Sequence, residues 1–176
     1  MKTTRMKNTR NLYLGKDNGN SKSMDESEIN KSVGKLQGYL GTFARNELEN
    51  LKVSHYPSFV IVNLDTRDGD GSHWIAIAMF LNDVYICDSL GTLMPNDDFP
   101  KELVNFLYRV TFRRRLHITR QLQQPTSNTC GLYCIFFIHY CVTHTFYSFL
   151  SKFTNDFALN DLLVTLYAKK YTNWKG

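Results

Sequence analysis

The longest apolar run of the chain extends from about Leu132 to Val142, directly after the polar stretch SNTCG. It is shorter than the ~20 residues that a helix needs to span a bilayer, and His139 interrupts it. Because the run is apolar nearly all round, it predicts a helix buried at the centre of a domain. Cys130 lies where the polar turn becomes this helix, either as a buried structural thiol or as a reactive centre.

The length of the chain fits one domain, because 176 residues bury roughly 70% of the surface of the extended chain. Residues 1–22 are polar and basic, and they predict a flexible arm that precedes a single domain at 23–176. The chain has only four cysteines, and no charged leader followed by an apolar segment is found at its start. We therefore expect a soluble protein that is not secreted and that works in the reducing interior of a cell. The net charge of +5 by itself favours polyanionic partners only weakly.

Strand patterns occupy the middle of the chain. Continuous apolar and β-branched residues predict a buried strand at 58–64. Two further runs, at 73–81 and 84–90, flank an Asn-Asp pair and predict an antiparallel hairpin. Alternation at 116–123 predicts one more strand.

Helical patterns flank these strands. Ser23 and Glu26 fit a capping box and predict a helix at 24–33, while 39–51 predicts a loop followed by a helical turn. Residues 100–112 and 155–171 have apolar side chains at helical intervals. Together, these patterns predict a compact α+β domain with a mixed, mainly antiparallel sheet and a central buried helix.

Cys130 is the candidate nucleophile. A thiol attacks as thiolate, so nucleophilic use requires a feature that lowers its pKa. The residues TSNT before Cys130 are N-cap types, and the first turn of a helix favours negative charge. Cysteine is also among the most buried residue types, so Cys134 and Cys141 are expected to belong to the core.

Three further residues complete a candidate catalytic set. His73 stands where a glycine-rich loop enters a strand, and Asp88 ends the partner strand of the same hairpin, where an acid can orient the imidazole. Gln124, six residues before Cys130, carries an amide that could stabilise an oxyanion together with the Cys130 backbone N–H. Individually, these residues could equally be a surface histidine, a turn former and a strand-end amide.

The order of these residues resembles the adenain family of adenovirus-type maturation proteases and, more distantly, the SUMO-specific proteases of the same clan. The similar segments are YLGTFARNEL, IVNLDTRDGDGSHWIAIA, YICDSLG and QQPTSNTCGLYCIFFIHYC, and the resemblance as a whole covers roughly Met24 to Asp161. The resemblance implies a papain-like α+β core with the nucleophile on the central helix. It further implies Cys130 as nucleophile, His73 as general base and acid, Asp88 as orienting acid and Gln124 as oxyanion donor.

Some features depart from the adenovirus pattern. Adenovirus enzymes carry glutamate where Asp88 stands, whereas SUMO-specific proteases use aspartate. The adenain spacing would select Gln123 for the oxyanion hole, and the SUMO-protease spacing selects Gln124, which we prefer. No cysteine lies between Cys87 and Cys130, so an activating viral peptide, if one acts here, is not expected to be linked by a disulfide at that position.

A basic cluster and a group of cysteines and histidines suggest other sites. Arg113, Arg114 and Arg115 could bind DNA, which adenain-like enzymes use as a cofactor, although a charge run at a helix end usually faces water. The cysteines and histidines after residue 129 lack the paired spacing of a zinc site, so no metal is expected.

The sequence therefore predicts a monomeric viral cysteine endopeptidase that needs no cofactor for its chemistry. We expect it to cleave precursor proteins during virion maturation, at small residues such as glycine, in the virion and the host-cell interior. One alternative is a protease that removes ubiquitin-like proteins of the SUMO type from their conjugates. Another is a non-catalytic module that binds nucleic acid through the basic cluster.

Overall fold

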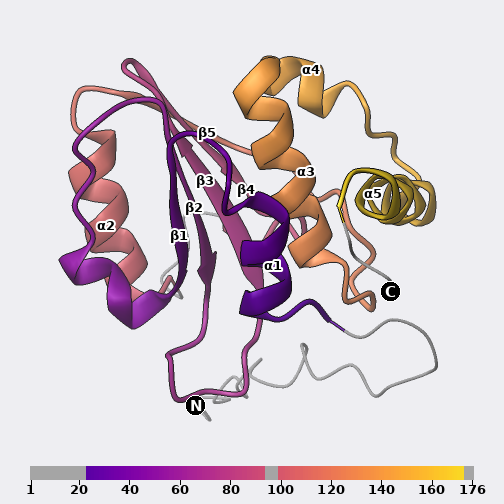
Figure 1. The fold of residues 1–176 in the computed structure, drawn as a ribbon, viewed down its shortest axis with the longest axis horizontal. Coiled ribbons are helices and arrows are strands. Elements are labelled where there is room, and N and C mark those ends of the chain that lie inside the picture. The colour runs from indigo at the N-terminus through magenta and orange to yellow at the C-terminus, as the bar shows by residue number, and fades with distance from the viewer. Residues whose placement is uncertain (1–22, 94–98, 173–176) are drawn as a thin grey trace, which may run out of the picture.

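The computed structural model describes residues 23–93 and 99–172, so the predicted arm at 1–22 lies outside the described residues. A five-stranded sheet forms the middle layer, with α2 on one face and α1, α3, α4 and α5 on the other (Figure 1). The elements in chain order are α1 (Glu26–Val33), β1 (Tyr39–Ala44), the 3-10 helix η1 (Arg45–Asn50), β2 (Ser58–Asn63), β3 (Trp74–Met79), β4 (Asp83–Cys87), α2 (Lys101–Thr111), β5 (Arg115–Ile118), α3 (Cys130–Thr143), α4 (Phe146–Leu150) and α5 (Phe157–Tyr171).

The strands follow one another across the sheet in chain order. β2, β3 and β4 pair antiparallel, and this includes the predicted hairpin. The edge strands β1 and β5 instead run parallel to β2 and β4. Parallel neighbours need a crossover connection, which η1 and its loop provide on one side and α2 on the other. The sheet is thus mixed, with its antiparallel pairs at the centre.

Alternation along the strands separates two hydrophobic cores, one on each face of the sheet. On β3, Ala76 and Ala78 face the layer of α3, while Ile75 and Ile77 face the layer of α2. The small alanine side chains let α3 lie close against the middle of the sheet. The N-terminal end of α3 is thereby fixed beside the ends of β3 and β4.

The predicted central helix is present as α3, and it is buried over most of its length. The predicted α+β architecture with a mixed sheet and a central buried helix is confirmed, but the sheet is not mainly antiparallel, because the two edge pairs are parallel. Within residues 23–93 and 99–172, no helix combines the length and the hydropathy that crossing a bilayer requires.

The capping box of α1 differs from the predicted one. Asp25, not Ser23, is the N-cap, and its side chain accepts from the Glu28 backbone N–H at 2.8 Å while Glu28 accepts from Asp25 N–H. Two overlapping acid- or hydroxyl-x-x-Glu patterns lie two residues apart, and the helix uses the second. Ser23 is left at the edge of the pocket described below.

Two strand predictions need correction. Residues 39–44 were predicted as a loop but form β1. The strand is stabilised by hydrogen bonds to β2, and such pairing between segments cannot be predicted from the local sequence pattern. The predicted strand at 116–123 is shorter, since β5 ends at Ile118. Gln123 and Gln124 therefore lie in a loop, and strand alternation does not decide which of them faces the pocket.

Candidate active site

Cys130 is the first residue of α3, and Thr129 is the N-cap. The Thr129 side chain does not cap α3 but donates a hydrogen bond of 3.0 Å to Asp161 of α5. The amide groups of the first helical turn therefore remain available around the Cys130 sulfur, where the positive end of the helix dipole favours a thiolate. Cys130 is 8% exposed, so its side chain borders the pocket rather than the deep core.

His73 and Asp88 lie side by side, as the hairpin predicts. His73 immediately precedes β3 and Asp88 immediately follows β4, and these strands are antiparallel neighbours. His73 Nε2 and Asp88 Oδ1 are 2.8 Å apart, and both residues are buried. With Nε2 engaged by the carboxylate, Nδ1 is the ring nitrogen left for the pocket, and it has no hydrogen-bond partner among the described residues.

Asp88 is itself held by several donors. Its Oδ2 accepts from the Leu93 N–H at 2.6 Å and from the Thr92 hydroxyl at 3.1 Å. Its backbone N–H and carbonyl both bond to the Thr119 hydroxyl, at 2.9 Å each. The carboxylate that contacts His73 is thus held in position by the protein itself.

The three side chains form a coupled electrostatic system. Burial alone would lower the pKa of His73, but its interactions with Asp88 and Cys130 raise that pKa to about 9. Burial would likewise raise the pKa of the Cys130 thiol, but His73 and the backbone N–H groups of Trp74 and Gly131 lower it. Both shifts favour a thiolate beside an imidazolium, the ionised form that a nucleophilic cysteine requires.

The other three cysteines have the opposite tendency. Burial raises the pKa of the Cys87 and Cys134 thiols, and it raises that of Cys141 to about 12. All four cysteines are free thiols. Cys130 is therefore the one cysteine of the chain whose surroundings activate its sulfur.

The two candidate glutamines differ in position. Gln123 is buried and lines the pocket, while Gln124 is not among the lining residues. Gln123 Nε2 donates to the Ser127 carbonyl at 2.7 Å, and its Oε1 accepts from the Ser89 hydroxyl at 2.7 Å. The Gln123 amide thus borders the pocket that contains Cys130, and it retains a second N–H.

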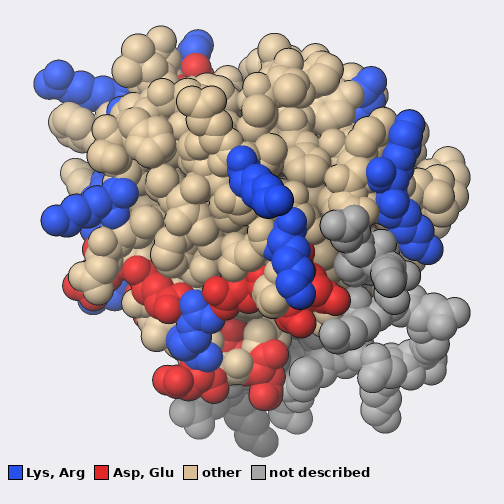
Figure 2. Space-filling model, viewed as in Figure 1, with Lys and Arg blue, Asp and Glu red and all other residues tan. Residues whose placement is uncertain are grey.

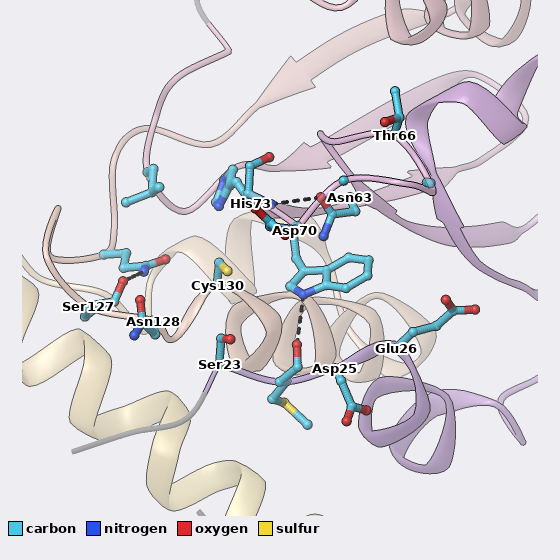
Figure 3. Close-up of a pocket in the computed structure, with 18 of the residues that line it drawn as sticks. Ser23, Asp25, Glu26, Asn63, Thr66, Asp70, His73, Ser127, Asn128 and Cys130 are labelled. Atoms are coloured by element: carbon cyan, nitrogen blue, oxygen red, sulfur yellow. Dashed lines mark hydrogen bonds between the residues drawn. The ribbon is translucent and has the colours of Figure 1, made fainter. Parts of the chain in front are cut away.

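Cys130 and His73 share a pocket of about 480 Å³. Its walls come from residues 23–26, from the loop between β2 and β3, and from the loop that leads into α3. Figure 3 shows Cys130 between His73 and Ser23 at the end of α3. The Trp74 indole N–H donates to the Met24 carbonyl at 3.0 Å, which ties β3 to the segment that borders the pocket.

The basic cluster lies away from this pocket, and its arginines are mostly engaged within the protein. Arg114 donates to the carbonyls of Phe80, Leu81 and Val110. The Arg115 guanidinium pairs with the Asp83 carboxylate at 2.9 Å. Among the described residues, Arg113 has no hydrogen bond or ion pair, and its guanidinium lies 5.3 Å from the centre of the Phe112 ring.

One supporting residue escaped the sequence analysis. Asp161 of α5 accepts hydrogen bonds from Thr129, at 3.0 Å, and from the Tyr133 hydroxyl, at 2.9 Å, and so secures the first turn of α3. These contacts join residues 32 and 28 positions apart, and no local pattern announces them. Within the described part of the chain, no three cysteine, histidine or acidic side chains group as metal ligands.

Comparison with known proteins finds similarity to proteases of adenoviruses. The family model of the adenovirus endoprotease matches residues 39–165. The protease of bovine adenovirus 2 is 29% identical over 131 residues, which cover 63% of this chain and 58% of that protein. The protease of bovine adenovirus 4 is 28% identical over 155 residues, covering 74% of this chain and 69% of that protein. The chain spans little more than half the length of the bovine adenovirus 2 relative.

Solved structures share the fold at low sequence identity. ChlaDub1 from Chlamydia trachomatis matches with a TM-score of 0.57 and 15% identity, covering 85% of this chain and 90% of that one. A protease of ASFV matches with a TM-score of 0.50 and 14% identity, covering 79% and 63%. The family model covers most of the chain, and so the chain belongs to the adenovirus endoprotease family of cysteine peptidases.

Proposed function

We propose that this chain is a cysteine endopeptidase in which Cys130 is the nucleophile, His73 the general base and acid, and Asp88 the residue that orients His73. The observation that carries the proposal is the bond of 2.8 Å between His73 and Asp88 beside the one thiol whose pKa is lowered. Membership of a cysteine peptidase family supports the same chemistry.

In the proposed reaction, the Cys130 sulfur bonds to the carbonyl carbon of the scissile peptide, and the π electrons move to the oxygen. As the tetrahedral intermediate collapses, the C–N bond breaks and His73 gives its proton to the departing amine. Water then attacks the thioester while His73 takes up a proton from it. The carboxylic acid product leaves, and the thiolate is restored.

The developing oxyanion needs donors close to Cys130. We assign this role to the backbone N–H of Cys130 and to the side-chain amide of Gln123. The position of Gln123 in the pocket lining, and the absence of Gln124 from it, support this choice. The bond between Gln123 and the Ser127 carbonyl fixes the orientation of the amide.

The proposed substrates are viral precursor proteins, cut at small residues such as glycine during virion maturation, in the virion or the host-cell interior. The burial of Cys130 and His73, 8% and 6% exposed, supports a narrow approach to the sulfur that suits small side chains. Kinship with adenovirus proteases supports a viral setting.

The proposal includes DNA and an activating peptide as cofactors of a monomeric enzyme. Of Arg113, Arg114 and Arg115, Arg113 is the best placed to contact a phosphate, since the other two have partners within the chain. Any activating peptide is proposed to bind without a disulfide, because Cys87, Cys134 and Cys141 are buried in the core and Cys130 is assigned as the nucleophile. A gel-shift series tests DNA binding, which should weaken steeply as salt increases.

A substrate profile tests the proposed activity most directly. The purified chain and its Cys130→Ala variant are incubated with a random peptide library, and the cleaved bonds are identified by mass spectrometry. We expect cleavage next to small residues by the unaltered chain and none by the variant. Equal cleavage by both would show that the activity does not depend on Cys130.

Protein fusions distinguish the class of substrate. Fusions of SUMO and of ubiquitin are offered beside the glycine-containing peptides at equal concentration. Preference for the peptides supports an endopeptidase of precursor proteins. Preference for the fusions would replace it with the deconjugating alternative, while leaving the catalytic residues as assigned.

A further inference from the structure

Acidic side chains gather at the end of the molecule that holds the pocket. Figure 2 shows them over α1 and over the loop between β2 and β3. The chain as a whole is basic, but 6 of its 21 Lys and Arg and only 1 of its 16 Asp and Glu lie within residues 1–22. The remaining residues carry equal numbers of both charges, so the acidic end reflects local placement and not the composition of the chain.

Three carboxylates line the pocket beside the catalytic residues, and we call them the acidic rim: Asp25, Glu26 and Asp70. One guanidinium, that of Arg67, also lines it. Arg67 pairs with Glu26 and, on its other side, with Glu47. The Arg67 guanidinium is thus occupied by these two carboxylates and makes no ion pair with Asp70.

Asp70 differs from the other two members of the acidic rim. Asp25 caps α1 and Glu26 pairs with Arg67, whereas Asp70 has no hydrogen bond or ion pair among the described residues. Asp70 lines the same pocket as His73 and Asn63 (Figure 3). Its carboxylate is therefore free to meet a charged group of a ligand.

The loop that carries Asp70 is held in place by its own hydrogen bonds. Asn63 Oδ1 accepts from the N–H groups of Asp65, at 2.9 Å, and of Ser72, at 3.2 Å. Asp65 in turn accepts from the Gly71 N–H at 3.3 Å. Gly71 has a φ of 83°, a conformation that side chains other than glycine rarely adopt. Asp70 is thus presented by a fixed loop.

A second observation in the same pocket supports the binding of a ligand there. His73 is 6% exposed, and its Nδ1, next to the reactive thiol, has no hydrogen-bond partner in the described chain. A buried polar atom without a partner costs free energy unless a ligand or the nucleophile uses it. The acidic rim therefore borders a functional cavity and is more than an acidic patch on the surface.

We propose that the acidic rim selects peptide substrates with a lysine or arginine side chain close to the scissile bond, and that Asp70 is the residue that determines this specificity. The inference rests on the proposed peptidase function and adds a substrate class to it. A cation next to Asp70 meets an unpaired carboxylate, while an acidic side chain there would be repelled.

Paired peptides test the selection. Each pair contains one glycine cleavage site and carries either lysine or glutamine at the same position, and the position is moved along both sides of the cut. The readout is the ratio of kcat/KM for the lysine peptide to that for the glutamine peptide. We expect a ratio of about 5 at the best position at low ionic strength, and a smaller ratio as salt screens the charges.

The Asp70→Asn variant should bring this ratio close to 1. The matched control is Asp68→Asn, which removes an equal charge from an exposed residue of the same loop that does not line the pocket, and it should keep most of the ratio. A ratio near 1 in the unaltered chain would overturn the proposal. So would an equal loss of ratio in both variants, or an Asp70→Asn effect that is the same for both peptides of a pair.

Binding separates this inference from the proposed function. The Cys130→Ala protein is titrated with the fluorescent forms of the same peptides, and anisotropy reports affinity without any turnover. Tighter binding of the lysine peptide, lost in the Cys130→Ala, Asp70→Asn double variant, supports the acidic rim even if no peptide is cleaved. Cleavage without any preference for lysine in either measurement would contradict the inference and leave the peptidase proposal standing.

Discussion

Two histidine–aspartate pairs lie at opposite ends of β4. Asp88 follows its last residue and bonds to His73, while Asp83 is its first residue and bonds to His117. The distance between Nε2 and Oδ1 is 2.8 Å in both pairs. A search for close histidine–aspartate contacts would therefore find both and could not rank them.

The two pairs differ in their burial and in the side chains that surround them. The first pair is buried beside a cysteine at a helix N-terminus. The second lies nearer to solvent, and Asp83 also pairs with Arg115. His117 stacks on Tyr85, with ring centroids 4.7 Å apart, and lies at the end of β4 opposite to Cys130. Both contacts can orient an imidazole, but only the contact at His73 is buried beside a thiol whose pKa is lowered.

Replacing each histidine by alanine should give the largest difference in activity between the two pairs. His73→Ala removes the base and the positive charge that lower the pKa of Cys130, so kcat/KM for a cleavable peptide should fall by about 10⁴-fold or more. His117→Ala should change kcat/KM by no more than about twofold per folded molecule. The measurement is kcat/KM for each variant, corrected for the folded fraction determined by circular dichroism. Similar losses of kcat/KM in both variants would contradict the assignment.

Changing each aspartate should have a smaller but still unequal effect. Asp88→Asn keeps the shape but removes the charge that favours imidazolium, and kcat should fall by about 10³-fold. Asp83→Asn should leave kcat within about twofold. An Asp83→Asn enzyme as impaired as Asp88→Asn would show that the burial of the first pair is irrelevant.

The pH dependence of activity tests whether Asp88 raises the pKa of His73. Because the pKa of His73 is raised to about 9 from an ordinary value of 6.5, the imidazolium persists at neutral pH and is lost as pH rises through about 9. Activity should therefore fall on the alkaline side near pH 9, and in Asp88→Asn this limb should move to lower pH. The stabilisation linked to His73 should likewise be complete below pH 6.5 and disappear towards pH 9. An unchanged alkaline limb in the variant would contradict the role of Asp88.

The two glutamines offer a further contrast near the first pair. Gln123→Ala removes a pocket-lining amide, so kcat should fall by about 10²-fold. Gln124→Ala should have an effect of at most about threefold. Steady-state kinetics on one peptide decide between them, and the reverse order would restore Gln124 as the donor.

Much of this arrangement could be predicted from the sequence, because its signals are local. A buried strand, a hairpin and an apolar helix each have a distinct pattern, and the hairpin places His73 and Asp88 at adjacent strand ends. The cysteine at the start of the apolar helix follows from the change in polarity at Thr129. These features required no knowledge of distant contacts.

What could not be predicted depends on contacts between distant segments. β1 forms through its pairing with β2, and Gln123 is oriented by Ser89, 34 positions away. The end of β5 at Ile118 placed both glutamines in a loop, where alternation between neighbours no longer applies. The acidic rim likewise combines α1 with the loop before β3, and no single window of sequence contains both.

The smallest effect on activity is expected in the buried part of α3. Cys134 is 1% exposed and lies one helical turn after Cys130, in the core against the sheet. Cys134→Ser would bury a hydroxyl in apolar surroundings and should lower the free energy of unfolding by about 1–3 kcal/mol. Urea titration measures the loss, while kcat per folded molecule should stay within about twofold. A large loss of kcat with unchanged stability would place Cys134 in the chemistry.

The most direct test measures the reactivity of all four thiols against pH. The folded protein is treated with iodoacetamide for short times at a series of pH values, and the modified cysteines are quantified by mass spectrometry. The account predicts rapid alkylation of Cys130 already below the pH at which an ordinary thiol ionises, with the other three cysteines protected, and loss of this reactivity in His73→Ala. Alkylation of Cys130 that rises only at the pH of an ordinary thiol, or that is unchanged in His73→Ala, would contradict an ion pair between the sulfur and the imidazole.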